Sequence, residues 1–269
     1  MEFAINYSLQ SAALLAAGHI RIDRFKTPDW PDLIAQASFQ APVAVHFTLR
    51  AGSGNLKRTD WGLIEGLLEQ TGTPYINLHL NPTVQDFPGF DIGTPEPTQF
   101  NQVVERLFED VRVVTKRFGP ERVIAENVPY RGAGGKILRP AVEPEVIYRI
   151  LDETGCGLLL DISHARIAAH HLAIDEREYM AQLPVERLRE LHFTGLHNLN
   201  GRLQDHLPIL EADWPALEWV LGRIRSGEWA RPWLLAFEYG GVGEKLEWRS
   251  DPAVIAEQVP LLYAMVTGI

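Results

Sequence analysis

The sequence of 269 residues contains only one cysteine, Cys156. A single cysteine cannot form a disulfide within the chain, and this favours a reducing compartment such as the cytoplasm. Positive charge is also scarce, since 25 Lys and Arg stand against 35 Asp and Glu, for a formal net charge of −10. Proteins that bind a phosphate backbone usually carry clustered Lys and Arg, so this balance argues against a nucleic-acid-binding protein.

Long hydrophobic runs are missing as well. The apolar run from Ala12 to Ala17 is too short to span a bilayer, and the first residues lack the basic region that opens a signal peptide. We therefore expect no membrane association. No Gly-x-Gly-x-x-Gly motif follows the first predicted strand and no Walker-type loop is present, so an open nucleotide-binding sheet loses its usual support.

Eight short segments rich in β-branched and large aliphatic residues recur along the whole chain. Each is bounded by Gly, Pro or polar residues, and this pattern predicts β-strands. The predicted strands are Phe3–Tyr7, Ile20–Phe25, Val43–Leu49, Tyr75–Leu80, Val123–Val128, Leu158–Ile162, Leu188–Thr194 and Trp233–Tyr239.

Helical patterns fall between these strands. The clearest is Thr98–Phe118, where apolar residues recur at three- and four-residue spacing from Val103 to Val114. The other predicted helices are Leu9–Ala17, Trp30–Ala37, Trp61–Gln70, Pro144–Glu153, Ala165–Leu172, Arg177–Gln182, Trp214–Arg225 and Pro252–Val266.

The alternation of strands and helices predicts an α/β fold with parallel pairing through right-handed crossovers. Eight such units in a chain close to the typical barrel length of about 250 residues favour a closed (β/α)8 TIM barrel. Because no linker-like change in composition appears, we predict a single domain over residues 1–269. The longest non-periodic stretches all follow strands, which places them on the catalytic face of a barrel; they are 81–97, 129–142 and 196–213.

Side chains that can bind metal ions occur late in six consecutive predicted strands. Parallel barrel strands all end on the same face, so these side chains should crown one end of the barrel. In chain order they are His46, His79, Glu126, Asp161, His192 and Glu238, and the stretches after strands six and seven add His164, Asp205 and His206.

The carboxylates are more informative than the imidazoles, because a single His in a strand is often a hydrogen-bonded core residue. Glu126, Asp161 and Glu238 lie in apolar strands where few Lys or Arg occupy comparable positions, and an unpaired buried carboxylate is costly. Imidazole and carboxylate ligands suit Fe, Zn or Mn. Nine candidates exceed what one ion takes, so we expect two or three divalent ions, with Glu126 or Glu238 as a bridge.

Other polar residues near the predicted strand ends are less decisive. His197 follows the flexible Gly195, and we weigh a ligand or substrate contact equally with a structural role. Asn127 directly follows Glu126 and is a candidate substrate contact or extra ligand. His170 and His171 lie in a predicted helix, so we expect them on the surface, and Cys156 precedes strand six on the opposite face.

Several of these stretches carry a resemblance to a known family. They are Val43–Leu49, Asn77–Leu80, Glu126–Tyr130, Leu158–His164 and, most specifically, Glu178–Pro184 running into Glu190–Gly195. On these residues the chain resembles the xylose-isomerase-like barrel superfamily of divalent-metal enzymes. Within it, the likeness is to the multinuclear non-heme iron-dependent oxidative enzymes, which modify cysteine-containing ribosomal peptides.

The resemblance covers roughly His46 to Tyr239 and implies a metal centre, a peptide substrate and a partner protein that binds the peptide. The implied iron ligands are His46, His79, Glu126, Asp161, His164, His192, His206 and Glu238. Glu126, Glu238 and Asp205 are the candidate catalytic carboxylates, Asp205 also as a residue that orients an imidazole. His164 stands where the peptide-modifying enzymes usually have Asn, as in the endonuclease IV and sugar-isomerase branches, and Asp205 and His206 are adjacent rather than one residue apart.

Three reactions follow as hypotheses. The first is iron-dependent oxidation of a peptide or small thiol. The second is isomerisation or epimerisation of a sugar or sugar phosphate, in which a carboxylate such as Glu126 or Glu238 moves a proton. The third is phosphodiester hydrolysis at a trinuclear zinc site. The negative net charge of the chain argues against this third reaction. A barrel that binds a metal or a small molecule without catalysis is the non-enzymatic alternative. The sequence predicts no particular oligomeric state.

Overall fold

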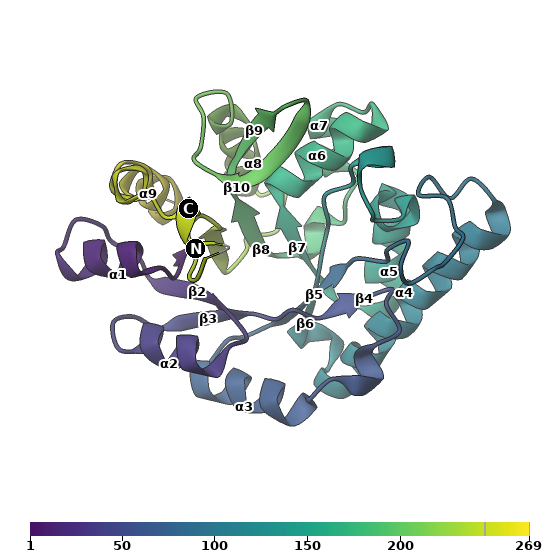
Figure 1. Ribbon diagram of the computed structural model, residues 1–269, viewed down its shortest axis with the longest axis horizontal. Coiled ribbons are helices and arrows are strands. Elements are labelled where there is room, and N and C mark those ends of the chain that lie inside the picture. Colours follow the sequence, from purple (N-terminus) through teal and green to yellow (C-terminus); the bar gives the residue numbers. More distant parts are fainter. Residues whose placement is uncertain (245, 269) are drawn as a thin grey trace. The chain divides into compact units, whose positions relative to one another are not determined.

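A computed structural model describes residues 1–244 and 246–268 of the chain. The chain folds into two compact units, whose elements are labelled in Figure 1. Unit 1 comprises Met1–His46, Leu63–Thr73 and Glu190–Ile269, and unit 2 comprises Phe47–Gly62 and Pro74–Arg189. The prediction of one domain over residues 1–269 stays a prediction.

Unit 1 is built on parallel strands in the order β3-β2-β1-β11-β8. Their bounds are Val43–His46 for β3, Arg24–Pro28 for β2, Glu2–Asn6 for β1, Leu234–Phe237 for β11 and Leu188–Phe193 for β8. The helices are α1 (Leu9–Ala16), α2 (Pro31–Ser38), α3 (Trp61–Thr71, mostly in this unit), α8 (Trp214–Arg225) and α9 (Pro252–Thr267), with a short helical turn at Glu247–Arg249. Fully buried aromatic side chains such as Phe3, Phe25 and Phe237 form its core.

Unit 2 has parallel strands in the order β7-β6-β5-β4. Their bounds are Gly157–Asp161 for β7, Val123–Glu126 for β6, Ile76–Leu80 for β5 and Arg50–Ala51 for β4. The α-helices are α4 (Pro97–Phe118), α5 (Pro144–Thr154), α6 (Ile162–Leu172) and α7 (Glu176–Ala181). Short 3-10 helices lie at Leu56–Arg58, Pro120–Arg122, Gly132–Gly134, Arg139–Val142 and Val185–Arg187.

The α/β alternation expected from the sequence is confirmed, and so is the amphipathic character of the longest helix. In α4 the side chains of Val103, Leu107, Val111 and Val114 are all buried. The helix packs its apolar face on α5 and β6, which explains the three- and four-residue spacing in the sequence. No helix in residues 1–244 and 246–268 is long and apolar enough to cross a membrane.

The second predicted strand is displaced. Residues 20–25 were expected to be extended, but β2 covers Arg24–Pro28. Asp23 accepts a hydrogen bond from the backbone N–H of Phe3, with an N–O distance of 2.8 Å, just before the strand begins. The polar residues Lys26 and Thr27 are buried in β2. A strand with this composition does not show the apolar pattern on which the prediction depended.

The third predicted strand, Val43–Leu49, is shorter than expected, since β3 ends at His46 and Arg50–Ala51 forms the separate strand β4. In unit 2 the side chain of Asn77 takes the place of a strand partner for Phe47. Its Oδ1 accepts from Phe47 N at 2.7 Å, and its Nδ2 donates to Phe47 O at 3.2 Å. The backbone polar groups of Phe47 are thus satisfied without a ladder.

The stretch 196–213 was expected to be irregular, but it contains an antiparallel hairpin of β9 (Gly195–Leu199) and β10 (Arg202–Leu207). The turn is Asn200-Gly201, and both residues have positive φ angles, 55° and 82°. Asn-Gly is the preferred pair for a two-residue hairpin turn of this type, so the sequence did carry the signal.

Cys156 provides a test of the packing of unit 2. Its side chain is fully buried before β7, and burial raises the pKa of the thiol to about 11. Because the thiolate is the reactive form, the folded protein should not react with Ellman's reagent at mildly alkaline pH, whereas the unfolded chain should release one equivalent of the chromophore. Rapid reaction of the folded protein would contradict the buried position.

Candidate functional site

Unit 2 brings four predicted ligands together at the carboxyl ends of β5, β6 and β7. His79 lies opposite Glu126 in the β5–β6 register, and its Nε2 is 3.2 Å from Glu126 Oε2. His164 Nδ1 is 3.5 Å from both Glu126 Oε1 and Asp161 Oδ2. Glu126, Asp161 and His164 each offer a ligand atom, and these atoms lie within 4.8 Å of one another. We call these four residues the unit 2 cluster.

Main-chain carbonyls orient both imidazoles of this cluster. His79 Nδ1 is 3.1 Å from Leu49 O, and His164 Nδ1 is 3.0 Å from Asn127 O. When Nδ1 donates to a carbonyl, the ring tautomer leaves the lone pair on Nε2, which is the usual arrangement of a metal-binding histidine.

Asn127 fixes the backbone of Asp161. Its Nδ2 donates to Asp161 O and its Oδ1 accepts from Asp161 N, both at 2.9 Å. Asp161 in turn caps α6, since its Oδ1 accepts from His164 N at 2.7 Å. His164 therefore lies in the first turn of a helix rather than in the expected loop. This geometry favours a positioning role for Asn127 over the substrate contact or extra ligand weighed from the sequence.

Unit 1 gathers the other four predicted ligands around one carboxylate, that of Glu238. His192 Nδ1 is 3.1 Å from Glu238 Oε1, His46 Nδ1 is 3.9 Å from the same oxygen, and His206 Nδ1 is 3.8 Å from Glu238 Oε2. The rings of His46 and His192 have centroids 5.2 Å apart. We call His46, His192, His206 and Glu238 the unit 1 cluster.

His206 is held in an unusual backbone conformation. Its φ angle is 58°, rare for a residue other than glycine, and the β9–β10 register is irregular between Gln204 and Leu207. Its N–H donates to Thr194 Oγ1 at 3.1 Å, and its Nδ1 lies 3.0 Å from Glu238 O. Bulges of this kind redirect a side chain and are common beside active sites. The sequence placed His206 in a loop, whereas it belongs to β10.

The hairpin also requires a glycine. A Cβ atom at Gly195 would lie 1.8 Å from Pro208 O, so no other residue fits there. His197 Nε2 is 2.8 Å from the same Pro208 oxygen. The ring therefore ties the two ends of the hairpin together, and this contact favours the structural role for His197. Asp205 is buried next to His206 and accepts from Gln204 Nε2 at 3.1 Å.

Two residues outside the predicted ligand set, Glu190 and Lys26, support His192; from the sequence Lys26 could equally be a substrate contact or a packing residue. Glu190 Oε1 is 2.9 Å from His192 Nε2, and the same carboxylate forms a buried ion pair with Lys26 and accepts from Trp233 Nε1 at 3.2 Å. Burial alone would raise the pKa of Glu190, but Lys26 and His192 hold it at about 2. The ionised carboxylate favours the tautomer with the proton on Nε2, so the lone pair of Nδ1 faces Glu238 and Nδ1 is the candidate ligand atom.

The spacing of Glu190 and His192 is visible in the sequence, but its meaning became clear only from the fold. Glu190 lies two residues before His192 in β8, which places both side chains on one face of the strand. Lys26 comes from β2, in the region where the predicted strand was displaced. His170 and His171 are exposed on α6, as expected.

The donors in the two clusters fit divalent transition metals. The unit 1 cluster offers three imidazoles and one carboxylate, and the unit 2 cluster offers two imidazoles and two carboxylates. Each therefore contains a set of two His and one carboxylate, the ligand type of non-heme Fe(II) sites. The positioned second ring nitrogens are a further feature of metal-binding histidines.

Comparison with known proteins places the chain in a family. Residues 29–226 match the family of RiPP precursor modification enzymes MbnB/TglH/ChrH, which act on precursors of ribosomal peptides. The match covers more than half of the chain, which therefore belongs to this family. This confirms the resemblance seen in the sequence.

Two of the sequence relatives are UPF0276 proteins. A UPF0276 protein of Pseudomonas aeruginosa (strain UCBPP-PA14) is 30% identical over 159 residues, which are 57% of this chain and 53% of the relative. A UPF0276 protein of Acaryochloris marina is 24% identical over 221 residues, 81% of this chain and 74% of the relative. The match thus spans about half the length of the Pseudomonas protein.

Solved structures confirm the fold class, a xylose-isomerase-like TIM barrel. D-psicose 3-epimerase, solved with D-fructose, has a TM-score of 0.60 at 11% identity and covers 100% of this chain and 99% of its own. An AP endonuclease of family 2 from Brucella melitensis has a TM-score of 0.59 at 16% identity, over 97% and 99%. A xylose isomerase-like TIM barrel fused to a dioxygenase has a TM-score of 0.52 at 15% identity, over 99% and 44%. At these identities the likeness concerns the fold alone.

The Lys26–Glu190 pair leads to a stability prediction. Lys26→Met leaves the buried Glu190 without its cation, and breaking a buried ion pair from one side costs about 3–5 kcal/mol. Urea unfolding should therefore show a strong destabilisation of this variant. The double variant Lys26→Met/Glu190→Gln should recover much of the loss, because no uncompensated charge remains. A single variant as stable as the wild type would show that the pair does not hold Glu190 ionised.

Proposed function

We propose that this protein is an iron-dependent oxidative enzyme that modifies a cysteine-containing precursor peptide. The observation that carries the proposal is that each unit of a chain from this peptide-modifying family has its own cluster of imidazoles around buried carboxylates. Two or three divalent ions, with iron favoured over zinc or manganese, would be held by His46, His79, Glu126, Asp161, His164, His192, His206 and Glu238.

The side chains of the clusters would bind, orient and exchange protons. Glu126 and Glu238 each lie between two or more imidazoles, so either carboxylate is positioned as a bridge or as a proton acceptor. Bound iron would supply the one-electron redox chemistry that imidazoles and carboxylates lack. A substrate thiol would lose its proton to a carboxylate such as that of Glu238, whose Oε2 lies 3.8 Å from His206 Nδ1. Asp205, next to His206, would orient that imidazole.

The substrate would be a peptide with cysteine, presented by a partner protein that binds the rest of the precursor. The family match supports a precursor peptide as substrate, and the cysteine and the partner protein follow from the resemblance seen in the sequence. A reducing cytoplasm, expected from the lone cysteine of the chain, would keep such a substrate as a thiol.

The function is tested with protein prepared without oxygen, loaded with Fe(II) and incubated with the cysteine-containing peptide encoded beside its gene, together with the product of any adjacent partner gene. Mass spectrometry should show a mass change in the peptide only when both iron and dioxygen are present. In a parallel assay the same metal-loaded protein is incubated with ketose sugars, which tests for epimerase activity. Epimerised sugar with an unchanged peptide, or full peptide conversion with zinc alone, would overturn the proposal.

Metal content tests the ligands independently of turnover. Glu126→Gln should lower the metal content of the purified protein by at least one equivalent, and by more if this carboxylate bridges, because Gln is a weak metal ligand. Glu238→Gln should do the same. Elemental analysis measures both losses.

Buried carboxylates outside the clusters provide matched controls. Asp110 in unit 2 accepts from the backbone of Gly52 and Gly54, and Asp213 in unit 1 accepts from the backbone of Leu196 and Leu210. Asp110→Asn and Asp213→Asn should keep the wild-type metal content. Full metal loading of both cluster variants would refute their roles as ligands.

A further inference from the structure

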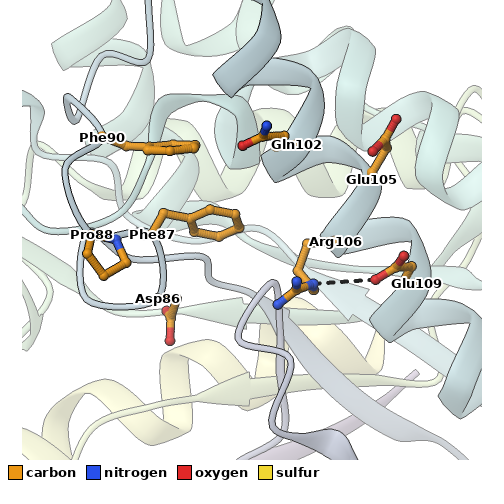
Figure 2. A pocket seen from close by; sticks show the side chains of 8 residues that line it. All are labelled: Asp86, Phe87, Pro88, Phe90, Gln102, Glu105, Arg106 and Glu109. Atoms are coloured by element: carbon orange, nitrogen blue, oxygen red, sulfur yellow. Dashed lines mark ion pairs between the residues drawn. The ribbon is translucent and has the colours of Figure 1, made fainter.

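The surface of unit 2 has a pocket between the segment after β5 and the N-terminal half of α4 (Figure 2). Phe87, Pro88 and Phe90 line one side, with the two phenyl centroids 5.3 Å apart, and Glu105, Arg106 and Glu109 of α4 line the other. Its volume is about 350 Å³. Among the described residues Glu105 forms no ion pair, so we call this the acidic aromatic pocket.

A second pocket continues along α4. It lies between the segment after β4 and the C-terminal half of the helix and has a volume of about 650 Å³. Four cations line it, namely Lys57, Arg106, Arg112 and Lys116. Arg106 pairs with Glu109 and Arg112 with Glu153, both at 3.4 Å, while Lys57 and Lys116 have no ion pair within residues 1–244 and 246–268. We call this the basic pocket, and it stands out in a chain of net charge −10.

The two pockets adjoin, because Arg106 and Glu109 line both. Gln102 lines the far end of the first and Lys116 the far end of the second. At a rise of about 1.5 Å per helical residue, the 14 steps from Gln102 to Lys116 span about 21 Å. This equals the length of roughly six residues of extended peptide. A ligand that fills both pockets therefore has the dimensions of a short peptide segment.

Two hydrogen-bonded carboxylates hold the walls of this groove in place. Asp86 Oδ2 accepts from Arg50 Nη2 at 2.7 Å and from Thr83 N and Oγ1 at 2.9 and 2.6 Å. The buried Asp110 Oδ2 accepts from Gly52 N and Gly54 N at 2.8 and 2.9 Å. Because the walls are fixed before a ligand arrives, binding costs less conformational entropy.

We propose that the two pockets bind one extended peptide segment, with a lysine or arginine side chain in the acidic aromatic pocket and carboxylates in the basic pocket. Glu105 would pair with the cation while Phe87 and Phe90 contact it through their ring faces. Lys57 and Lys116 would pair with the carboxylates. The inference rests on the proposed function in taking a peptide as substrate, but the binding itself needs no metal.

The test is fluorescence anisotropy with a labelled peptide that has a lysine near one end and two glutamates near the other, separated by Gly and Ser. The wild type should bind it. Lys57→Glu/Lys116→Glu and Glu105→Lys should each weaken binding about tenfold, since one or two reversed charges at a partly exposed site change the free energy by roughly 1–2 kcal/mol. Arg122→Glu, which reverses an exposed charge just beyond the end of α4, is the matched control and should bind like the wild type.

A charge-swapped probe makes the test specific. A peptide whose glutamates are replaced by lysines should bind the Lys57→Glu/Lys116→Glu variant more tightly than the wild type. If Glu105→Lys binds the original peptide as the wild type does, the acidic aromatic pocket is not used and the inference fails. It also fails if the wild type does not bind the peptide.

Metal content separates this inference from the proposed function. The pocket variants change no cluster residue, so their metal content and circular dichroism should equal those of the wild type. Peptide binding to a protein that takes up no metal would support the groove and refute the metal-dependent function. If the metal-loaded pocket variants oxidise the substrate peptide as fast as the wild type, and the wild type does not bind the labelled peptide, the proposed function is supported and the groove is refuted.

Discussion

A carboxylate buried at the end of an apolar strand has to be compensated by positive charge, and this constraint governs both units of the protein. Glu126, Asp161 and Glu238 are at most 7% exposed, and burying a carboxylate without a compensating partner costs several kcal/mol, on the order given by transfer data. At least one imidazole lies within 4 Å of each carboxylate, namely His164 beside Asp161, two rings beside Glu126 and three beside Glu238. A neutral imidazole supplies a hydrogen bond but no charge, so the clusters gain most from a divalent cation that both kinds of side chain can bind.

Glu190 is a buried acid that is not among the candidate ligands, and its charge is compensated in a different way. It is 3% exposed, similar to Asp161, yet it is matched by the ammonium group of Lys26, and its second oxygen accepts from Trp233. The charge is thus neutralised within the protein, as expected for a structural ion pair. Glu190 and Glu238, both in unit 1, differ in their neighbours: Glu190 contacts a lysine together with His192, whereas Glu238 faces three histidines.

The sequence predicted the residue types of the clusters because apolar strands make an Asp, Glu or His conspicuous. The strand ends at Glu126 and Asp161 were close to the observed ones for the same reason. The pairing of Lys26 with Glu190 was not predicted, because the two residues are 164 positions apart in the chain. The hairpin around Asn200-Gly201 and the bulge at His206 were missed because polar strands lack the apolar alternation on which strand prediction relies.

The supports of the histidines differ in a way that has chemical consequences. Main-chain carbonyls contact Nδ1 of His79 and His164 in unit 2 and of His206 in unit 1, so these three contacts come from the backbone rather than from another side chain. His192 instead contacts the ionised carboxylate of Glu190. A carboxylate partner makes an imidazole a stronger electron donor than a carbonyl does. Glu190 is therefore placed to strengthen His192 as an electron donor, and Lys26 supports this contact because it holds Glu190 ionised.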